Sequence, residues 1–285
     1  SGLQRWYKLN ASEIFNPTST EWSVDNNAYP SVYRSSLNFN AAVTSNLNLG
    51  YLSFLNNVSE FTFSTWVNLN SVAVGSNKFI FNGAPGRLGM QIFSDELRVY
   101  IDTGSEVNKY ASFATVDEGW FNIVLVYTGS SPSASDRAQI YKNGTFVSPS
   151  VGGNLSSTTP TYTGNTYIGS FSPPSSATTF NGEISNVSIF NTALSSPQVT
   201  TIYNNGQPQA SISHSPVHWW KLDNTTTGLL DSGSESNNAT NSGATEYAGF
   251  INEFAGDSIS MDSSNLVVSD LQQTSGFSPY ALDFG

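Results

Sequence analysis

Apolar and polar side chains alternate along much of the chain, which is the pattern of strands with one buried face. In residues 60–69, every second side chain from Phe61 to Leu69 falls on one face, and residues 97–102 alternate in the same way. Residues 120–127 are a nearly continuous apolar run, which indicates a strand buried on both faces. Further strands are expected at residues 77–82, 88–93, 107–114, 165–170 and 180–190.

Two local signals complete this pattern. Residues 140–147 are two short apolar runs around Asn143-Gly144, the dipeptide that most strongly favours a tight hairpin. Residues 195–206 begin with a serine, carry a proline in the first turn and end on a glycine, which predicts one short helix. Many short strands with one helix indicate an all-β jelly roll or sandwich.

Composition restricts the classes of partner. The 285 residues carry ten Lys and Arg against 21 Asp and Glu, a net charge of −11, which argues against nucleic acid and anionic membrane as partners. No run approaches the ~20 apolar residues of a membrane span, so membrane insertion is excluded. There is no cysteine, which excludes disulfides and thiolate metal sites.

Two short motifs occur twice. The sequence W-Y-K-L-N at residues 6–10 is repeated in similar form as W-W-K-L-D at residues 219–223. The sequence S-L-N-F-N at residues 36–40 is repeated in similar form as A-L-D-F-G at residues 281–285. A repeat with such wide spacing corresponds to a whole domain and not to a solenoid unit.

The repeated motifs predict two domains. Residues 1–206 are expected to form a first jelly-roll domain, the polar, proline-bounded residues 207–216 a linker, and residues 217–285 the incomplete N-terminal part of a second copy. A half-built sandwich leaves strand edges unpaired. We therefore expect residues 217–285 to continue in a longer parent chain or to pair with a neighbouring subunit, as part of a larger assembly.

Four motifs, in the same order, resemble those of the laminin-G-like, concanavalin A-like family of lectins and glucanases. They are F-T-F-S-T-W-V at 61–67, G-W-F-N-I-V-L-V-Y at 119–127, I-Y-K-N-G at 140–144 and F-N-G-E-I-S-N-V-S-I-F-N-T-A-L-S at 180–195. The resemblance spans about residues 6–206 and implies a concanavalin A-like jelly-roll β-sandwich of two antiparallel sheets, the front one concave. In tandem form it implies an exterior protein such as a bacterial adhesin, and residues 265–284 resemble segments of marine bacteriophage structural proteins.

The sequence gives no sign of catalysis. The glucanase branch of the family uses a Glu-x-Asp-x-x-Glu strand, because two carboxyl groups must face each other across the glycosidic bond. No glutamate of this chain has an aspartate two residues later, and the adjacent pairs Asp95-Glu96 and Asp117-Glu118 point to opposite faces of any strand. The histidines, His214 and His218, flank a proline and cannot form a helical metal pair. The chain is not expected to be an enzyme.

Calcium is the ion that the resemblance implies, held by oxygen ligands at the rim of the sandwich. The positions that match the family are Asn10, Asp25 and Asn26 in the first copy and Asp223 and Asp231 in the second. Two of the acids expected in the first copy are neutral side chains here. The alternative is that these segments are Asx-rich turns that need no ion.

A sugar-binding face needs aromatic rings and planar polar groups that are open to solvent. Arg98 and Tyr100 point away from the apolar face of their strand, and neighbouring strands add further groups. The candidate residues are Arg87, Gln91, Arg98, Tyr100, Asn108 and Tyr110. The alternative is an ordinary solvated sheet face.

These observations favour a non-catalytic exterior binding or adhesion module that recognises glycans or surface partners. A second interpretation is a structural building block of a virion, as a fibre, decoration or capsid-associated protein, or of a surface layer. A third is an accessory domain of a polysaccharide-active enzyme. All three place the chain outside the cell, on the cell surface or on a virion surface.

Overall fold

A computed structural model of the chain divides it into two compact units, Tyr33–Ile251 and Ser1–Val32 with Asn252–Gly285. In the first unit, the residues that the structure describes are 35–70, 77–83, 88–93, 96–101, 108–112, 119–133, 136–147, 150–151, 155–206, 208–209 and 211–248. In the second unit, they are two antiparallel ladders, β1 (Glu13–Asn16) with β2 (Glu21–Val24), and β19 (Ile259–Met261) with β20 (Leu266–Val268).

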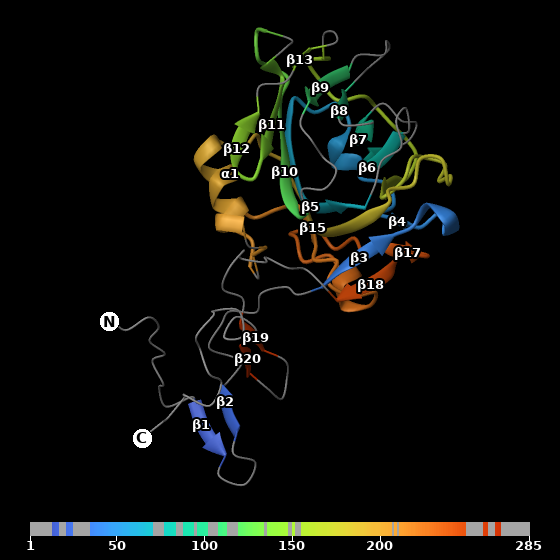
Figure 1. Ribbon diagram of the computed structural model, residues 1–285. Coiled ribbons are helices and arrows are strands. Elements are labelled where there is room, and N and C mark those ends of the chain that lie inside the picture. The colour runs from blue at the N-terminus through green and yellow to red at the C-terminus, as the bar shows by residue number, and fades with distance from the viewer. Residues whose placement is uncertain are drawn as a thin grey trace. The chain divides into compact units, whose positions relative to one another are not determined.

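The first unit is a sandwich of two antiparallel sheets (Figure 1). The first sheet has the order β12-β11-β10-β5-β15-β3-β18, and β16 also pairs with β15. Its strands are β3 (Ser35–Phe39), β5 (Glu60–Leu69), β10 (Phe121–Thr128), β11 (Ala138–Lys142), β12 (Thr145–Val147), β15 (Gly182–Phe190), β16 (His218–Trp220) and β18 (Thr245–Ala248).

The second sheet has the order β13-β9-β8-β7-β6-β14-β4-β17. Its strands are β4 (Asn46–Asn48), β6 (Asn77–Gly83), β7 (Leu88–Phe93), β8 (Glu96–Ile101), β9 (Asn108–Ser112), β13 (Ser150–Val151), β14 (Thr166–Ile168) and β17 (Thr240–Ser242). Short 3-10 helices lie at Ala41–Val43, Ser53–Leu55, Asn204–Gly206 and Thr227–Leu229. The predicted all-β sandwich of two antiparallel sheets is confirmed.

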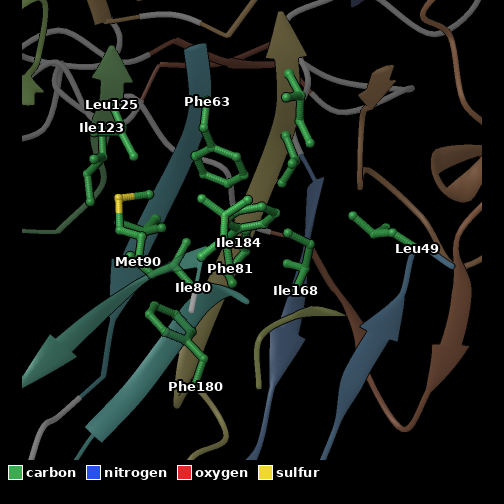
Figure 2. Close-up of a cluster of buried hydrophobic side chains, with 14 of the residues drawn as sticks. Leu49, Phe63, Ile80, Phe81, Met90, Ile123, Leu125, Ile168, Phe180 and Ile184 are labelled. Atoms are coloured by element: carbon green, nitrogen blue, oxygen red, sulfur yellow. The ribbon is translucent and has the colours of Figure 1, made fainter. Parts of the chain in front are cut away.

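The core lies between the two sheets because the apolar side chains of their alternating patterns point inward. Figure 2 shows side chains from both sheets meeting there, among them Phe63 and Ile184 from the first sheet and Met90 from the second. The rings of Phe63 and Phe81 pack with their centroids 4.7 Å apart. Burial of these side chains is the main favourable term in folding, at about 25 cal/mol per Å² of apolar surface.

The first sheet is covered on its outer face as well. Helix α1 (Ser196–Tyr203) lies on this side of the sheet (Figure 1). Its Val199 and Ile202 belong to one buried cluster with Val124 and Val126 of β10. The expected burial of this strand on both faces is thereby confirmed. No helix within the described ranges is long and apolar enough to cross a membrane.

The local signals in the sequence act as expected. Ser195 caps α1 in a capping box with Gln198, and Asn204, in the left-handed region at φ 50°, ends the helix. The hairpin between β11 and β12 places Asn143 at φ 50° and Gly144 at φ 72°. Both values suit the tight turn that this dipeptide favours.

The expected division at residues 207–216 is not found, and the partial second copy is not confirmed. Residues 217–248 belong to the same compact unit as the sandwich and contribute an edge strand to each sheet. In the first sheet β16 pairs with β15 and β18 with β3, and in the second sheet β17 pairs with β4. The physical reason is burial: Trp220 and Leu222 are fully buried in the common core.

Candidate functional site

Side chains of β7 and β8 form a polar and aromatic surface on the outer face of the second sheet. On β8, Leu97, Val99 and Ile101 are fully buried in the core, so the alternate residues face outward, as predicted. Gln91 of β7 lies opposite Arg98 of β8 in the sheet register. The structure thus brings Gln91, Arg98 and Tyr100, three of the predicted residues, onto one face.

Gln91 is the centre of this outer face. Its side-chain amide nitrogen donates to Asn77 Oδ1 at 3.0 Å and to the Tyr100 hydroxyl. The Tyr100 ring stacks beside Phe79, with centroids 6.5 Å apart and an interplanar angle of 25°. Because Gln91 is 1% exposed and held by two neighbours, the Tyr100 ring is fixed against the sheet.

Arg98 is positioned by contacts on both sides. Its guanidinium lies 3.6 Å from the centroid of the Phe93 ring, and Nη2 is 3.1 Å from Glu96 Oε2. The side chains of Arg98 and Glu96 are 21% and 32% exposed. A guanidinium held in one plane, with part of its surface in solvent, can present N–H donors to an oxygen-rich ligand.

Gly89 lies beside Tyr100, at a position where the sheet is too crowded for a side chain. Gly89 pairs with Tyr100 on one side and with Asn82 of β6 on the other. A Cβ on Gly89 would lie 3.1 Å from Asn82 Nδ2 and 2.8 Å from the Phe81 carbonyl oxygen. Asn82 is fully buried, and its Nδ2 has no hydrogen-bond partner, although its Oδ1 accepts from the Ser172 amide. A buried amide donor of this kind is uncommon.

The other predicted residues of this face are only partly described. Arg87 lies outside the described residues. Asn108 and Tyr110 are described by their backbone alone, which places them in β9, opposite Tyr100 and Arg98 respectively. The register therefore puts both on β9, next to β8, and their part in the site stays a prediction.

No role was predicted for Asn77 or Phe79, which contact Gln91 and Tyr100 respectively. The alternation of β6 is broken by a register shift between Phe79 and Phe81. Because of this irregularity, Ile80 and Phe81 are both buried in the core. A simple period of two along residues 77–82 therefore cannot identify which side chains face outward.

The predicted calcium ligands are not brought together by the described structure. Asn10, Asp25 and Asn26 lie outside the described residues. Asp223 Oδ1 accepts from the side-chain amide of Asn224 at 3.0 Å, and the side chain of Asp231 is fully buried. Within the described ranges, no group of three or more histidine, aspartate or glutamate side chains is placed to hold a metal ion.

Asp231 instead organises the loop that follows β16. Its Oδ1 accepts from the amides of Trp219 and Gly233, each at 2.9 Å. Its Oδ2 accepts from His218 Nδ1 at 2.6 Å and from the Asn237 amide at 3.0 Å. These four donors occupy the acceptor positions of the two carboxylate oxygens. Calcium at this loop remains a prediction.

The pKa of Asp231 reflects this arrangement. Burial by itself raises the pKa of the carboxyl group, but the hydrogen bonds from His218 and from the three backbone amides outweigh it. The pKa is therefore held below its ordinary value, and the ionised form is the one that the loop stabilises.

A small hollow lies on the outer face of the first sheet. It is lined by Ser64, Trp66, Asn186, Ser188, Ile202, Gln209 and Ile212. The Trp66 ring stacks on Tyr203 of α1, with centroids 5.8 Å apart. Because Trp66 is 4% exposed, it is not available as a platform for a ligand. The outer face of the second sheet is therefore the better candidate.

Comparison with known protein families agrees with this architecture. A laminin G-type family model, described as the concanavalin A-like lectin/glucanases superfamily, matches residues 40–200. The chain belongs to this superfamily. The resemblance of the four sequence motifs is thereby confirmed. Among curated proteins, none gives a significant sequence match.

Solved structures similar to this member of the concanavalin A-like superfamily have low sequence identity. A Bacteroides ovatus protein, provisionally assigned as carbohydrate-binding, is 18% identical, with a TM-score of 0.57 over 78% of this chain and 62% of that protein. A heptameric SAP-like pentraxin of Limulus polyphemus is 16% identical, with a TM-score of 0.49 over 75% and 97% of the two chains. The first likeness shows a shared fold.

Proposed function

We propose that this chain is a non-catalytic binding module, displayed outside the cell or on a particle surface, that recognises glycans on the outer face of β6, β7 and β8. The observation that carries the proposal is a partly exposed planar donor beside an aromatic ring on this face. Arg98 is partly exposed, and the Tyr100 ring, held by the buried Gln91 amide, lies in the next row of the sheet. Sugars offer hydroxyl groups to such donors and C–H faces to such rings.

The similar Bacteroides ovatus protein, provisionally assigned as carbohydrate-binding, supports the same ligand class. The number of carboxylic acids on this face supports a role in binding and not in hydrolysis. Among the described residues of β6, β7 and β8, Glu96 is the only carboxylic acid, and it is ion-paired with Arg98. Two facing carboxyl groups are needed for ordinary glycoside hydrolysis.

A glycan array on the purified chain, run with calcium and again with a chelator, tests the proposal. We expect selective binding to a defined set of glycans in the calcium buffer. Loss of binding in the chelator would support the predicted calcium site. A blank array in both buffers would overturn glycan recognition and favour the structural building block.

The residue assignment is tested with Arg98→Ala on any glycan that binds. Loss of hydrogen bonds from a charged donor is expected to weaken the affinity about 10- to 100-fold. Titration calorimetry measures this change, and a thermal melt confirms that the variant is folded. Two further tyrosine variants are compared. Tyr100→Ala should also weaken binding. Tyr247→Ala is the control, because Tyr247 is 42% exposed on the first sheet, away from the proposed site, and its loss should leave binding unchanged. Equal affinities for all three variants would place the site elsewhere.

A further inference from the structure

His218 of β16 lies between two carboxylates. Its Nδ1 is 2.6 Å from Asp231 Oδ2, and its Nε2 is 3.7 Å from Glu235 Oε2. We propose that His218 Nε2 and the Glu235 carboxylate bind a divalent transition-metal ion of the Zn²⁺ class. Both groups belong to β16 and the loop that follows it, so the site is separate from the proposed glycan-binding face of β6, β7 and β8.

Asp231 decides which imidazole nitrogen can bind a metal ion. Its carboxylate is stabilised in the ionised form by three backbone amides, so it accepts hydrogen bonds and has no proton to donate. The hydrogen bond from His218 therefore uses a proton on Nδ1. In the neutral ring the lone pair is then on Nε2, the nitrogen that faces Glu235. A carboxylate on the other ring nitrogen is also the usual partner of a metal-binding histidine.

The imidazole ring is fixed in this orientation. It stacks on the Trp220 ring, with centroids 5.1 Å apart and an interplanar angle of 13°, and the centroid of the Phe54 ring lies 5.2 Å away. The side chain of His218 is 2% exposed, whereas that of Glu235 is 62% exposed. A fixed nitrogen therefore faces a carboxylate that is free to turn toward an ion. Only the second ligand has to be ordered when the ion binds, which keeps the entropic cost small.

The two facing groups have matching chemistry for a metal ion. The neutral His218 Nε2 and the Glu235 oxygen are both acceptors, so neither can satisfy the other, whereas a cation between them interacts favourably with both. Two ligand atoms of a tetrahedral Zn²⁺ ion, each about 2.0–2.2 Å from it, are about 3.3–3.6 Å apart. The observed 3.7 Å therefore requires only a small movement of the Glu235 side chain.

The type of ligand also selects the class of ion. An imidazole nitrogen with a carboxylate oxygen suits Zn²⁺, whereas Ca²⁺ takes oxygen ligands. Within the described part of the chain, no third histidine, aspartate or glutamate side chain is placed to join the two. Water therefore fills the remaining positions, and the ion stays open to solvent.

Nitrogen NMR of the imidazole rings, on the full chain without a histidine tag, tests the proposal. The chain has two histidines, and His214, which is exposed, serves as an internal control. At about pH 7.5 we expect the His218 ring to carry a proton on Nδ1 alone. Added ZnCl₂ should shift the His218 Nε2 signal at about tenfold lower concentration than it shifts any signal of His214.

A variant at the exposed ligand tests the role of the carboxylate. Glu235→Gln changes an exposed side chain, so the fold should be retained, and the removal of the charged ligand should weaken Zn²⁺ binding at His218 about tenfold. The matched control is Glu60→Gln, an exposed glutamate of β5, which should leave Zn²⁺ binding unchanged.

Three results would each overturn the proposal. The first is a His218 ring protonated on both nitrogens before ZnCl₂ is added, because Nε2 would then form an ion pair with Glu235 and have no lone pair for a metal. The second is an equal response of the two histidines to ZnCl₂. The third is equal Zn²⁺ affinity of the Glu235→Gln and Glu60→Gln chains.

Discussion

Replacing Trp220 by alanine is expected to lower the free energy of unfolding by about 3–5 kcal/mol, the range for a buried aromatic side chain removed from a core. Trp220 is fully buried, and its indole N–H donates to the Asn237 carbonyl at 2.8 Å. The substitution therefore leaves a cavity and also removes a bond that holds the loop before β17.

Urea unfolding, followed by near-ultraviolet circular dichroism, measures this loss. The control is Tyr247→Ala, which lies in the same segment but is 42% exposed and should cost less than about 1 kcal/mol. A single transition that shifts with Trp220→Ala shows that residues 217–248 unfold with the sandwich. An unshifted main transition would instead support the separate domain that the repeated motifs predict.

Replacing Asp231 by asparagine is expected to cost about 2–4 kcal/mol at neutral pH. The asparagine keeps one acceptor oxygen, but it presents an amide group where the carboxylate accepts from His218 and from the Asn237 amide. The matched control is Glu235→Gln, because Glu235 lies 3.7 Å from the same His218 but is 62% exposed. Exposed pairs of this kind contribute little, so the control should change stability by less than about 1 kcal/mol.

The effect of Asp231→Asn should also depend on pH. Because hydrogen bonds hold the Asp231 pKa below its ordinary value of 3.8, the ionised carboxylate stabilises the fold at pH values above that value. This stabilisation is lost as the pH falls through the lower pKa of the folded state. The difference between wild type and variant should therefore shrink below about pH 4. Urea unfolding at neutral pH and at acid pH measures it, and a constant difference would contradict the assigned role.

Local elements could be predicted because their signals are local. The hairpin at Asn143-Gly144 requires two residues with positive φ, and the helix after Ser195 requires a capping side chain. The outward direction of Arg98 and Tyr100 follows from a strict period of two along β8. Each of these features depends on a few neighbouring residues.

The rest of the candidate face could not be predicted in the same way. The irregular pairing within β6 changes which side chains turn outward, and it depends on the partner strand β7. The position of the unpartnered Asn82 amide beside Gly89 is likewise a contact between strands. Nothing in the sequence around either residue indicates that the two meet.

The sequence by itself determined that the chain is an all-β sandwich, and which side chains of β8 face outward. Those features follow from periodicity and turn chemistry, which act within one strand or turn. The concanavalin A-like type was implied by the resemblance of the four motifs to that family. Only the tertiary structure decided that residues 217–248 complete the sandwich. The same is true of the Asp231 carboxylate, which accepts hydrogen bonds from nearby residues of its own segment. A W-W-K-L-D strand can add to any compatible sheet edge. Which edge it joins is set by the burial of Trp220 and Leu222 in a core built from distant parts of the chain.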